Sequence, residues 1–126
     1  MAESLVGEVA GWLGSPVAHD LTDKERLVLF VIAERCHRKT RRMLWHRGDK
    51  WPDGIPMTLS DTICLRAGMG ARTLTDVCQR LAGRGVEVRV EVGRDSIGRP
   101  VFAHRGRSVD FWLPPLPASV RLPERG

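Results

Sequence analysis

Hydrophobic residues in the first part of the chain recur at the spacing of an α-helix. Between Ser4 and Leu13 they fall on one stripe, and two glycines lie among the intervening residues. This spacing predicts an amphipathic helix, which we treat with the rest of residues 1–14 as an N-terminal element. Each glycine weakens the helix by about 1 kcal/mol relative to alanine. We therefore expect the apolar stripe to need a covering surface, either the core of the domain itself or a second subunit.

A second helix is predicted to begin at Thr22. Thr22 and Glu25 have the spacing of a capping box, in which the side chain of each residue bonds the backbone amide of the other. Residues 27–33 are apolar on all sides, so we expect this helix to be the central one of the fold. A buried strand is the alternative for this run. We expect the helix to continue to about Thr40, or as far as Trp45.

Residues 58–85 have the pattern of two helices joined by a tight turn. We predict a short helix over 58–66, a turn over 67–70, and a second helix over 71–85 that ends at glycine. Apolar residues at helical spacing predict the buried stripe of the second helix: Leu74, Val77, Cys78 and Leu81. Polar residues occupy its remaining surface: Arg72, Thr73, Thr75, Asp76, Gln79 and Arg80.

The C-terminal third of the chain has the signals of β-strands. Residues 86–92 alternate valine with charged residues, which predicts a half-buried strand. A reversal at 96–99 and apolar positions in 101–113 extend this to two or three antiparallel strands, so the predicted fold class is α+β. Residues 55–58 are a candidate for a short edge strand, since proline is tolerated there. The proline-rich residues 114–126 are either a linker or an extended arm packed on the body.

Positive charge is concentrated in two segments of a chain whose formal net charge is +5. Residues 35–50 carry a net charge of +6 and residues 66–107 a net charge of +5, whereas residues 1–25 carry −4. This distribution is typical of a protein that binds nucleic acid on one side. The excess of 17 arginines over three lysines has another explanation, a GC-rich genome. The position of the charge therefore carries more weight than its identity.

Several classes of function have little support in the sequence. No apolar run approaches the roughly 18 residues of a membrane span, and the acidic N-terminus is unlike a secretory signal. Three cysteines without a CxxC pair do not make a disulfide framework, and Cys36, His37 and His46 lack the spacing of a zinc site. No catalytic motif is present. We therefore expect a cytoplasmic protein that is not an enzyme and holds no metal or cofactor.

The segment from Arg72 to Leu81, followed by Arg84-Gly85-Val86, resembles the recognition helix and strand entry of winged helix-turn-helix regulators of bacterial type. The segment from Leu59 to Gly68 is similar to the helix that precedes it in that family. The resemblance covers residues 21–113 and implies a three-helix core with a two- or three-stranded wing. It also implies double-stranded DNA as the ligand and, often, a homodimer on a palindromic site. The basic segment 41–54 and the long third strand depart from the family pattern.

On this interpretation, residues 71–82 enter the major groove, where arginine, glutamine and threonine match the base edges. Asp76 either contacts a cytosine or forms an ion pair that orients Arg72 or Arg80. Residues 93–100 form a basic wing, which places two arginines on the DNA backbone or in the minor groove: Arg94 and Arg99. A third group is either a second backbone-binding patch or a solvated helix end: Arg38, Arg41 and Arg42.

The role of two tryptophans and the biological function each have more than one interpretation. Trp45 and Trp51 either stack on unpaired bases or fold the loop that contains them onto the body. The leading function is sequence-specific regulation of transcription at the nucleoid. Plasmid or phage replication or partition is an alternative with the same DNA contact. A winged helix used as a protein-interaction module is the alternative from another class.

Overall fold

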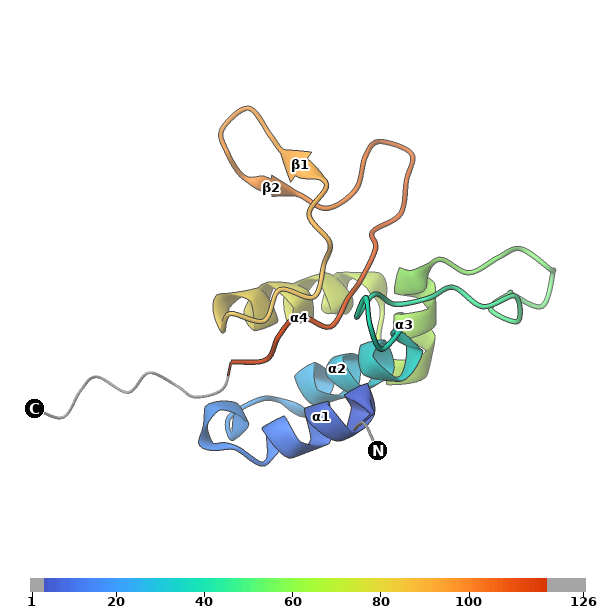
Figure 1. Cartoon of the computed structure of the whole chain (residues 1–126). Helices are drawn as coiled ribbons and strands as arrows, with labels where there is room; N and C mark the ends of the chain where they lie inside the picture. Colours follow the sequence, from blue (N-terminus) through green and yellow to red (C-terminus); the bar gives the residue numbers. More distant parts are fainter. Residues whose placement is uncertain (1–3, 118–126) are drawn as a thin grey trace, which may run out of the picture.

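The computed structural model describes residues 4–117 and has an α+β architecture (Figure 1). Within these residues it contains four α-helices, one 3-10 turn and a two-stranded antiparallel sheet. In chain order the elements are α1 (Leu5–Leu13), η1 (Pro16–Ala18), α2 (Asp23–Arg35), α3 (Leu59–Ala67), α4 (Ala71–Gly83), β1 (Gly93–Arg94) and β2 (Pro100–Val101).

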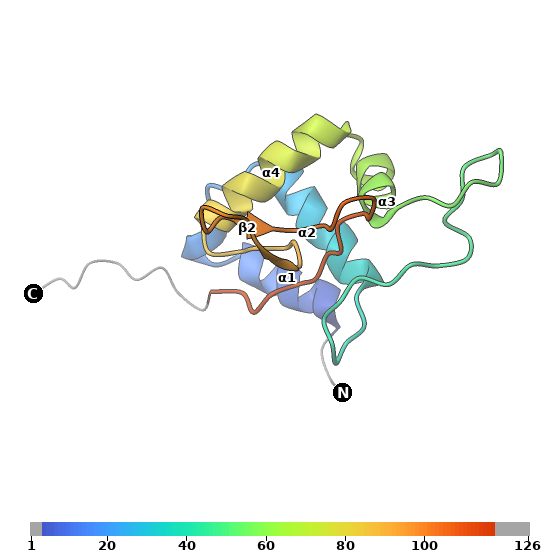
Figure 2. The same cartoon turned by 90° about the horizontal axis from the view of Figure 1, so that it is seen from above.

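Helix α2 is the centre of the fold, as its apolar sequence predicts. Helices α1, α3 and α4 all pack against it, and Figure 2 shows it between α1 on one side and α4 on the other. Val28, Leu29 and Ile32 are fully buried. Burial of such a side chain contributes roughly 1.5–3 kcal/mol, and it fixes the positions of the three neighbouring helices.

Helix α1 packs on the core of its own chain. The hydroxyl of Ser4 accepts a hydrogen bond from a first-turn amide at 3.0 Å and so caps the helix. Leu5, Val9 and Trp12 of the predicted stripe are buried and belong to the same hydrophobic core as α2. The sequence left open whether the domain's own core or a second subunit covers this stripe. In the structure the domain's own core covers it.

The described part of the proline-rich segment is an arm packed on the body. The indole N–H of Trp12 donates to the carbonyl of Pro117 at 2.8 Å. Pro114 is buried, and its carbonyl accepts a hydrogen bond from the guanidinium of Arg41 at 3.1 Å. Residues 118–126, the rest of the predicted tail, lie outside the described residues.

The start of α2 follows the prediction in part, and its end does not. The hydroxyl of Thr22 accepts from the amide of Glu25 at 3.2 Å. The carboxylate of Glu25, however, accepts from the Thr22 hydroxyl (3.1 Å) instead of completing the capping box. The helix ends at Arg35, ahead of the predicted Thr40, because Cys36 has an extended conformation.

Residues 36–43 form a reverse turn in place of the predicted helix end. Cys36 and Met43 form an antiparallel bridge, and the amide of His37 donates to the carbonyl of Arg42 at 2.9 Å. Arg41 has a φ of 58°, in the left-handed region that residues with a side chain seldom adopt. These bonds satisfy backbone groups that would otherwise continue the helix. The basic residues predicted at a helix end therefore lie on a turn.

Three extended segments lie side by side in antiparallel order. Backbone hydrogen bonds of 2.7–2.9 Å join residues 110–113 to residues 41–43 on one side and to residues 88–90 on the other. Each junction has a single bridge pair. In the described part of the chain, regular strands are limited to β1 and β2, where Gly93 pairs with Val101.

The strand predicted over 86–92 is therefore wrong in extent. Its first valines are buried as the alternation requires, but the neighbouring backbone groups form hydrogen bonds with side chains. The carboxylate of Glu87 accepts from the amide of Arg89 at 3.0 Å, and the carbonyl of Glu87 accepts from the indole of Trp112 at 2.9 Å. These bonds replace rungs of a regular ladder.

Residues 44–57 form a loop that projects from the helices (Figure 2). A buried ion pair anchors it, because the guanidinium of Arg35 donates two bonds, of 2.8 and 2.9 Å, to the carboxylate of Asp49. Desolvation alone would raise the pKa of Asp49. Hydrogen bonds from the His46 amide and from Arg35 outweigh it and leave this pKa below its usual value. The strand considered at 55–58 is reduced to one bridge at Pro56, because proline has no amide hydrogen to extend a ladder.

Replacing Asp49 with alanine should lower the free energy of unfolding by about 3 kcal/mol, since the buried Arg35 would keep only Glu34, an exposed side chain 3.4 Å from its Nε atom, as a counter-charge. Urea unfolding measures this difference. Arg47→Ala in the same loop removes an exposed charge and should change the value by less than about 0.5 kcal/mol. Similar effects of the two substitutions would contradict the role of the ion pair.

The same ion pair predicts a pH dependence. Because the folded-state pKa of Asp49 is lowered, its contribution to stability is present above the unfolded value of about 3.9 and is lost as the pH falls through the folded value. The free energies of unfolding of the wild type and of Asp49→Ala, measured with urea between about pH 6 and pH 3, should therefore approach each other at the acid end. A constant difference across this range would show that the carboxylate is not responsible.

Candidate nucleic-acid interface

Helices α3 and α4 meet at a tight turn that local signals fix. Thr58 and Asp61 form a capping box at the start of α3, with two hydrogen bonds of 3.0 Å. Gly68 ends α3 with φ 68° and ψ 43°, a left-handed conformation that glycine adopts without strain. Gly70 is the N-cap of α4. The turn predicted at 67–70 is therefore confirmed.

Helix α4 has the two faces that its sequence predicts. The apolar stripe is at most 4% exposed: Leu74, Val77, Cys78 and Leu81. Thr73 is half-buried, and the other predicted polar residues are exposed: Arg72, Thr75, Asp76, Gln79 and Arg80. The five exposed side chains do not all point the same way, and their contacts divide them into two groups. Thr73, half-buried, belongs to neither.

The first group lies opposite the buried stripe. Arg72, Asp76 and Gln79 are exposed there, and within residues 4–117 no other side chain bonds them. The hydroxyl of Thr75, beside them, donates to the carbonyl of Ala71 at 3.1 Å. The ion pair considered between Asp76 and a neighbouring arginine is not formed in this part of the chain. The outer face of α4 therefore offers unengaged donors and acceptors to a ligand.

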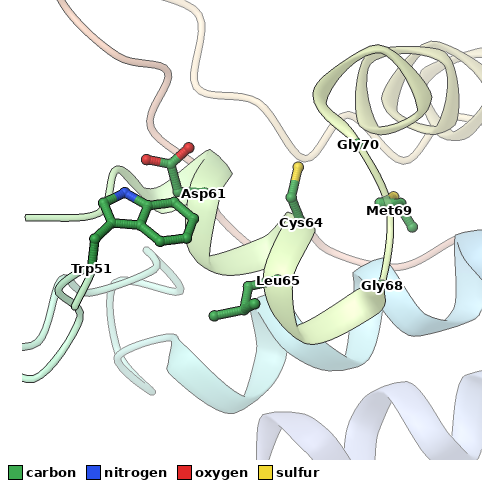
Figure 3. Close-up of a pocket in the computed structure, with 7 residues that line it drawn as sticks. All are labelled: Trp51, Asp61, Cys64, Leu65, Gly68, Met69 and Gly70. Atoms are coloured by element: carbon green, nitrogen blue, oxygen red, sulfur yellow. The ribbon is translucent and has the colours of Figure 1, made fainter. Parts of the chain in front are cut away.

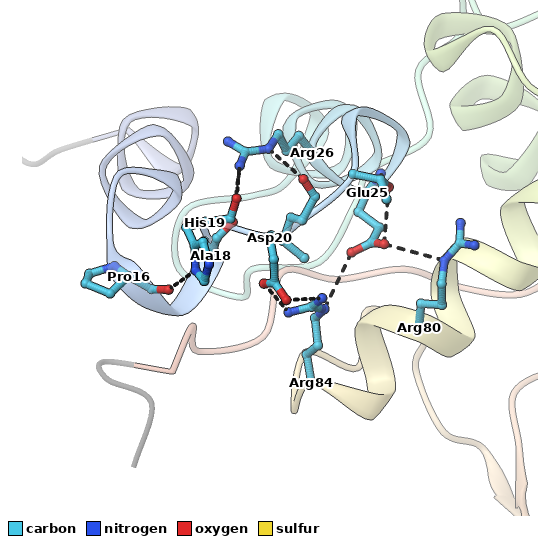
Figure 4. Close-up of polar contacts among 10 residues, drawn as sticks. Pro16, Ala18, His19, Asp20, Glu25, Arg26, Arg80 and Arg84 are labelled. Carbon is cyan, nitrogen blue, oxygen red and sulfur yellow. Dashed lines mark hydrogen bonds and ion pairs between the residues drawn. The ribbon is translucent and has the colours of Figure 1, made fainter. Parts of the chain in front are cut away.

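The second group turns toward the start of α2 (Figure 4). The Nε atom of Arg80 lies 3.4 Å from Oε1 of Glu25, and the Nε atom of Arg84 lies 3.7 Å from Oε2 of the same carboxylate. Arg84 also donates two bonds, of 2.7 and 3.0 Å, to Asp20, and this hydrogen bonding lowers the pKa of Asp20. Arg80, predicted as a DNA contact, thus has an acidic partner within the chain.

The hairpin predicted as a wing is present, and both of its arginines are exposed. Arg94 donates to the carbonyl of Gly98 at 2.8 Å and lies 3.3 Å from a carboxylate oxygen of Glu91. Arg99 lies 3.3 Å from a carboxylate oxygen of Asp95. The pKa of Asp95 is lowered, first by the backbone amide of Arg99. These exposed pairs are weak, so the two guanidinium groups are held in place but accessible.

The third predicted group divides in the same way. Arg38 and Arg42 are exposed on the turn at 36–43. Arg41 points inward, where its guanidinium donates to the carbonyl of Leu113 at 2.7 Å and to the carboxylate of Glu8. The hydrogen bond from Arg41 lowers the pKa of Glu8. The prediction of Arg41 as a DNA contact is not supported by this geometry, because its donors join α1 to the C-terminal segment.

Sequence reasoning missed the acidic partners of these arginines. Glu25 follows the spacing of the buried stripe of α2, with Val28, Leu29 and Ile32 at i+3, i+4 and i+7, so periodicity could have identified it as buried. Such a carboxylate requires a cationic partner. No local signal indicates which arginine supplies it, because the contacts join residues far apart in the chain.

A hollow of about 410 Å³ lies beside the turn between α3 and α4 (Figure 3). Trp51 of the projecting loop borders it, together with Asp61, Cys64 and Leu65 of α3. Trp51 is 38% exposed and Trp45 is 45% exposed. The indole of Trp45 donates to a carbonyl of its own loop at 3.1 Å. Both tryptophans therefore pack in part on the chain and keep part of each ring accessible.

The cysteines on the two helices differ in burial. Cys78 is buried as predicted, and desolvation raises its pKa to about 11. Cys64 is only half-buried, at the edge of the hollow. Among residues 4–117, no group of three His, Cys, Asp or Glu side chains is placed to hold a metal ion. In the same residues, no helix is long and apolar enough to cross a membrane.

Comparison of the chain with models of protein families, with curated proteins and with solved structures found no match.

Replacing Arg41 with alanine should lower the free energy of unfolding by about 2 kcal/mol, because buried carbonyls and Glu8 lose a charged donor. Arg38→Ala removes the same charge from the same turn and should change it by less than about 0.5 kcal/mol. Chemical denaturation of both variants decides the matter. An Arg41→Ala protein as stable as wild type would restore this arginine as a candidate for ligand contact.

Proposed function

We propose that this chain binds duplex DNA in a sequence-specific manner as a winged helix-turn-helix protein. In this proposal α4 enters the major groove, and the hairpin at residues 93–101 contacts the adjacent backbone or minor groove. The order of the extended segments supports the fold. Residues 41–43, between α2 and α3, pair with residues 110–113, and these pair with residues 88–90, after α4. Helix α1 is an addition to this core.

The observation that carries the proposal is the outer face of α4. It is supported from behind by a fully buried stripe, and it presents Arg72, Asp76 and Gln79 to solvent without partners among residues 4–117. Arginine donates two bonds to guanine, glutamine matches adenine, and aspartate accepts from cytosine. A rigid helix with these groups on its exposed side has the chemistry that reading base edges requires.

Four further arginines are suited to positioning the helix on the duplex. Arg94 and Arg99 lie on the hairpin, and Arg38 and Arg42 lie on the turn at 36–43. All are exposed, and the exposed ion pairs of the hairpin are weak enough to yield to phosphate. Contacts to phosphate fix the register of a protein on DNA, whereas base contacts supply its specificity.

The proposed DNA contact uses residues of one chain only. A homodimer stays a prediction without an assigned surface, because the apolar stripe of α1 on which it rested is covered by the chain's own core. Regulation of transcription at the nucleoid, in the cytoplasm, is the role that we favour, and replication or partition of a plasmid or phage would use the same contact. The alternative from another class is a protein-interaction module, which assigns no ligand to the polar face of α4.

The test begins with fluorescence anisotropy of the purified protein against random-sequence duplex at low and high salt, followed by selection of a target site. Arg72→Ala with Gln79→Ala should then weaken binding to the selected site by about 10-fold or more, since each good bidentate contact contributes about 1–3 kcal/mol. Lys24→Ala removes an exposed cation from α2 and should leave the affinity nearly unchanged. Arg80→Ala is not used here, because Arg80 faces Glu25 and does not lie on the outer face of α4.

Melting temperatures close to that of the wild type would show that the double variant is folded. Failure of the wild type to bind any duplex at low salt would exclude the proposal. Equal weakening by Lys24→Ala would show that net charge, and not the face of α4, determines binding.

A further inference from the structure

The loop before α2 is built to hold an acidic side chain against α4 (Figure 4). The guanidinium of Arg26 donates to the carbonyls of Ala18 (3.2 Å), His19 (3.3 Å) and Leu21 (3.1 Å), which fixes the backbone on both sides of Asp20. Asp20 then accepts the two bonds from Arg84. The backbone that carries Asp20 is therefore fixed. Asp20 and Arg84 are 55% and 34% exposed, but their two hydrogen bonds set this pair apart from the single contacts of the hairpin arginines.

The second acidic group of this contact is buried. Glu25 is 2% exposed, and its Oε2 atom has no hydrogen-bond partner within residues 4–117. A carboxylate in such a place is costly unless cations compensate it. The compensating charges are Arg80, on the flank of α4, and Arg84, the C-cap residue that follows the helix. Asp20 and Glu25 thus neutralise two of the three arginines of α4 and its C-cap.

A carboxylate that accepts two parallel bonds from a guanidinium offers the geometry of a phosphate. We propose that Asp20 and Glu25 are specificity-determining residues that occupy Arg84 and Arg80 in place of DNA phosphate. This inference rests on the proposed function. Its physical consequence is that the flank of α4 contributes little sequence-independent attraction, and that the helix depends on its outer face, with Arg72 and Gln79, to bind.

The charges of α4 show why this matters for specificity. Together with the C-cap residue Arg84, α4 carries three arginines and Asp76, a net charge of +2, and the carboxylates of Asp20 and Glu25 reduce it to zero. Contacts of arginine with phosphate bind every sequence alike and dominate non-specific affinity. Withholding two arginines therefore lowers binding to random DNA more than binding to a site that the outer face recognises.

The experiment compares two substitutions that each remove one negative charge from exposed positions. Asp20→Asn breaks the pair with Arg84, whereas Asp23→Asn, in the first turn of α2, alters a side chain with no ion pair among the described residues. The full chain is titrated with random-sequence duplex by fluorescence anisotropy at several salt concentrations. Asp20→Asn should steepen the slope of log affinity against log salt by about 0.9, the value for one added phosphate contact. Between 50 and 200 mM salt this is about a 3.5-fold larger loss of affinity than for Asp23→Asn.

Removal of Arg84 tests whether this arginine causes the steeper salt dependence of Asp20→Asn. Arg84→Ala in the wild-type chain leaves Arg80 as the cationic partner of Glu25. At an unchanged melting temperature it should leave the slope unchanged, because that guanidinium is already occupied. In the Asp20→Asn chain it should cancel the gain. Equal slopes for Asp20→Asn and Asp23→Asn, at equal melting temperatures, would overturn the inference and leave the proposed function intact.

Elution from immobilised heparin separates failure of the inference from failure of the proposed function, because heparin is a polyanion without bases. Asp20→Asn should elute at higher salt than Asp23→Asn. If no variant binds duplex DNA, the proposed function fails, yet later elution of Asp20→Asn would still support the withholding of Arg84 from polyanions. Co-elution of the two variants would overturn the inference whatever the duplex result.

Discussion

Helix α2 has to be covered on most of its circumference, because Val28, Leu29 and Ile32 cannot face water without a large loss of stability. Helices α1, α3 and α4 supply that cover. Burial also extends to charged residues of the same helix. Glu25 near its start and Arg35 at its end are both taken out of solvent, and each then requires an opposite charge. The partners come from α4 and from the projecting loop, so the central helix determines where both of these lie.

Ion pairing reduces the positive charge that is available to a ligand. The chain has 20 lysines and arginines and 15 acidic residues. Most of the arginines between residues 66 and 107 lie within 4.0 Å of a carboxylate oxygen. Arg89, for example, is bonded to Glu87 and stacks 4.0 Å from the ring centre of Phe102. Net charge is therefore a poor guide to the surface available to DNA. The useful distinction is between arginines held by buried or rigid partners and arginines in exposed, weak pairs.

That distinction gives α4 two functional sides in our proposal. Its outer face, with Arg72 and Gln79, is free to contact bases, and its flank is engaged by Asp20 and Glu25. The first side favours binding to a preferred sequence, and the second limits attraction to all sequences. Specificity is a difference between two affinities, so lowering the non-specific one has the same effect on discrimination as raising the specific one.

The sequence by itself determined the helices, the tight turn at 67–70 and the two faces of α4, because periodicity, capping residues and left-handed glycine act within a few residues of each other. It also located the hairpin. The end of α2, the extent of the strand at 86–92 and the inward direction of Arg41 were decided only by tertiary structure. The last two involve a partner distant in the chain, since Arg41 bonds Leu113 and the backbone carbonyl of Glu87 bonds the indole of Trp112. The end of α2 follows from the turn at 36–43, whose residues 41–43 pair with residues 110–113. Charge and propensity at one position cannot specify such a partner, since it is chosen when the helices pack and water is removed between them.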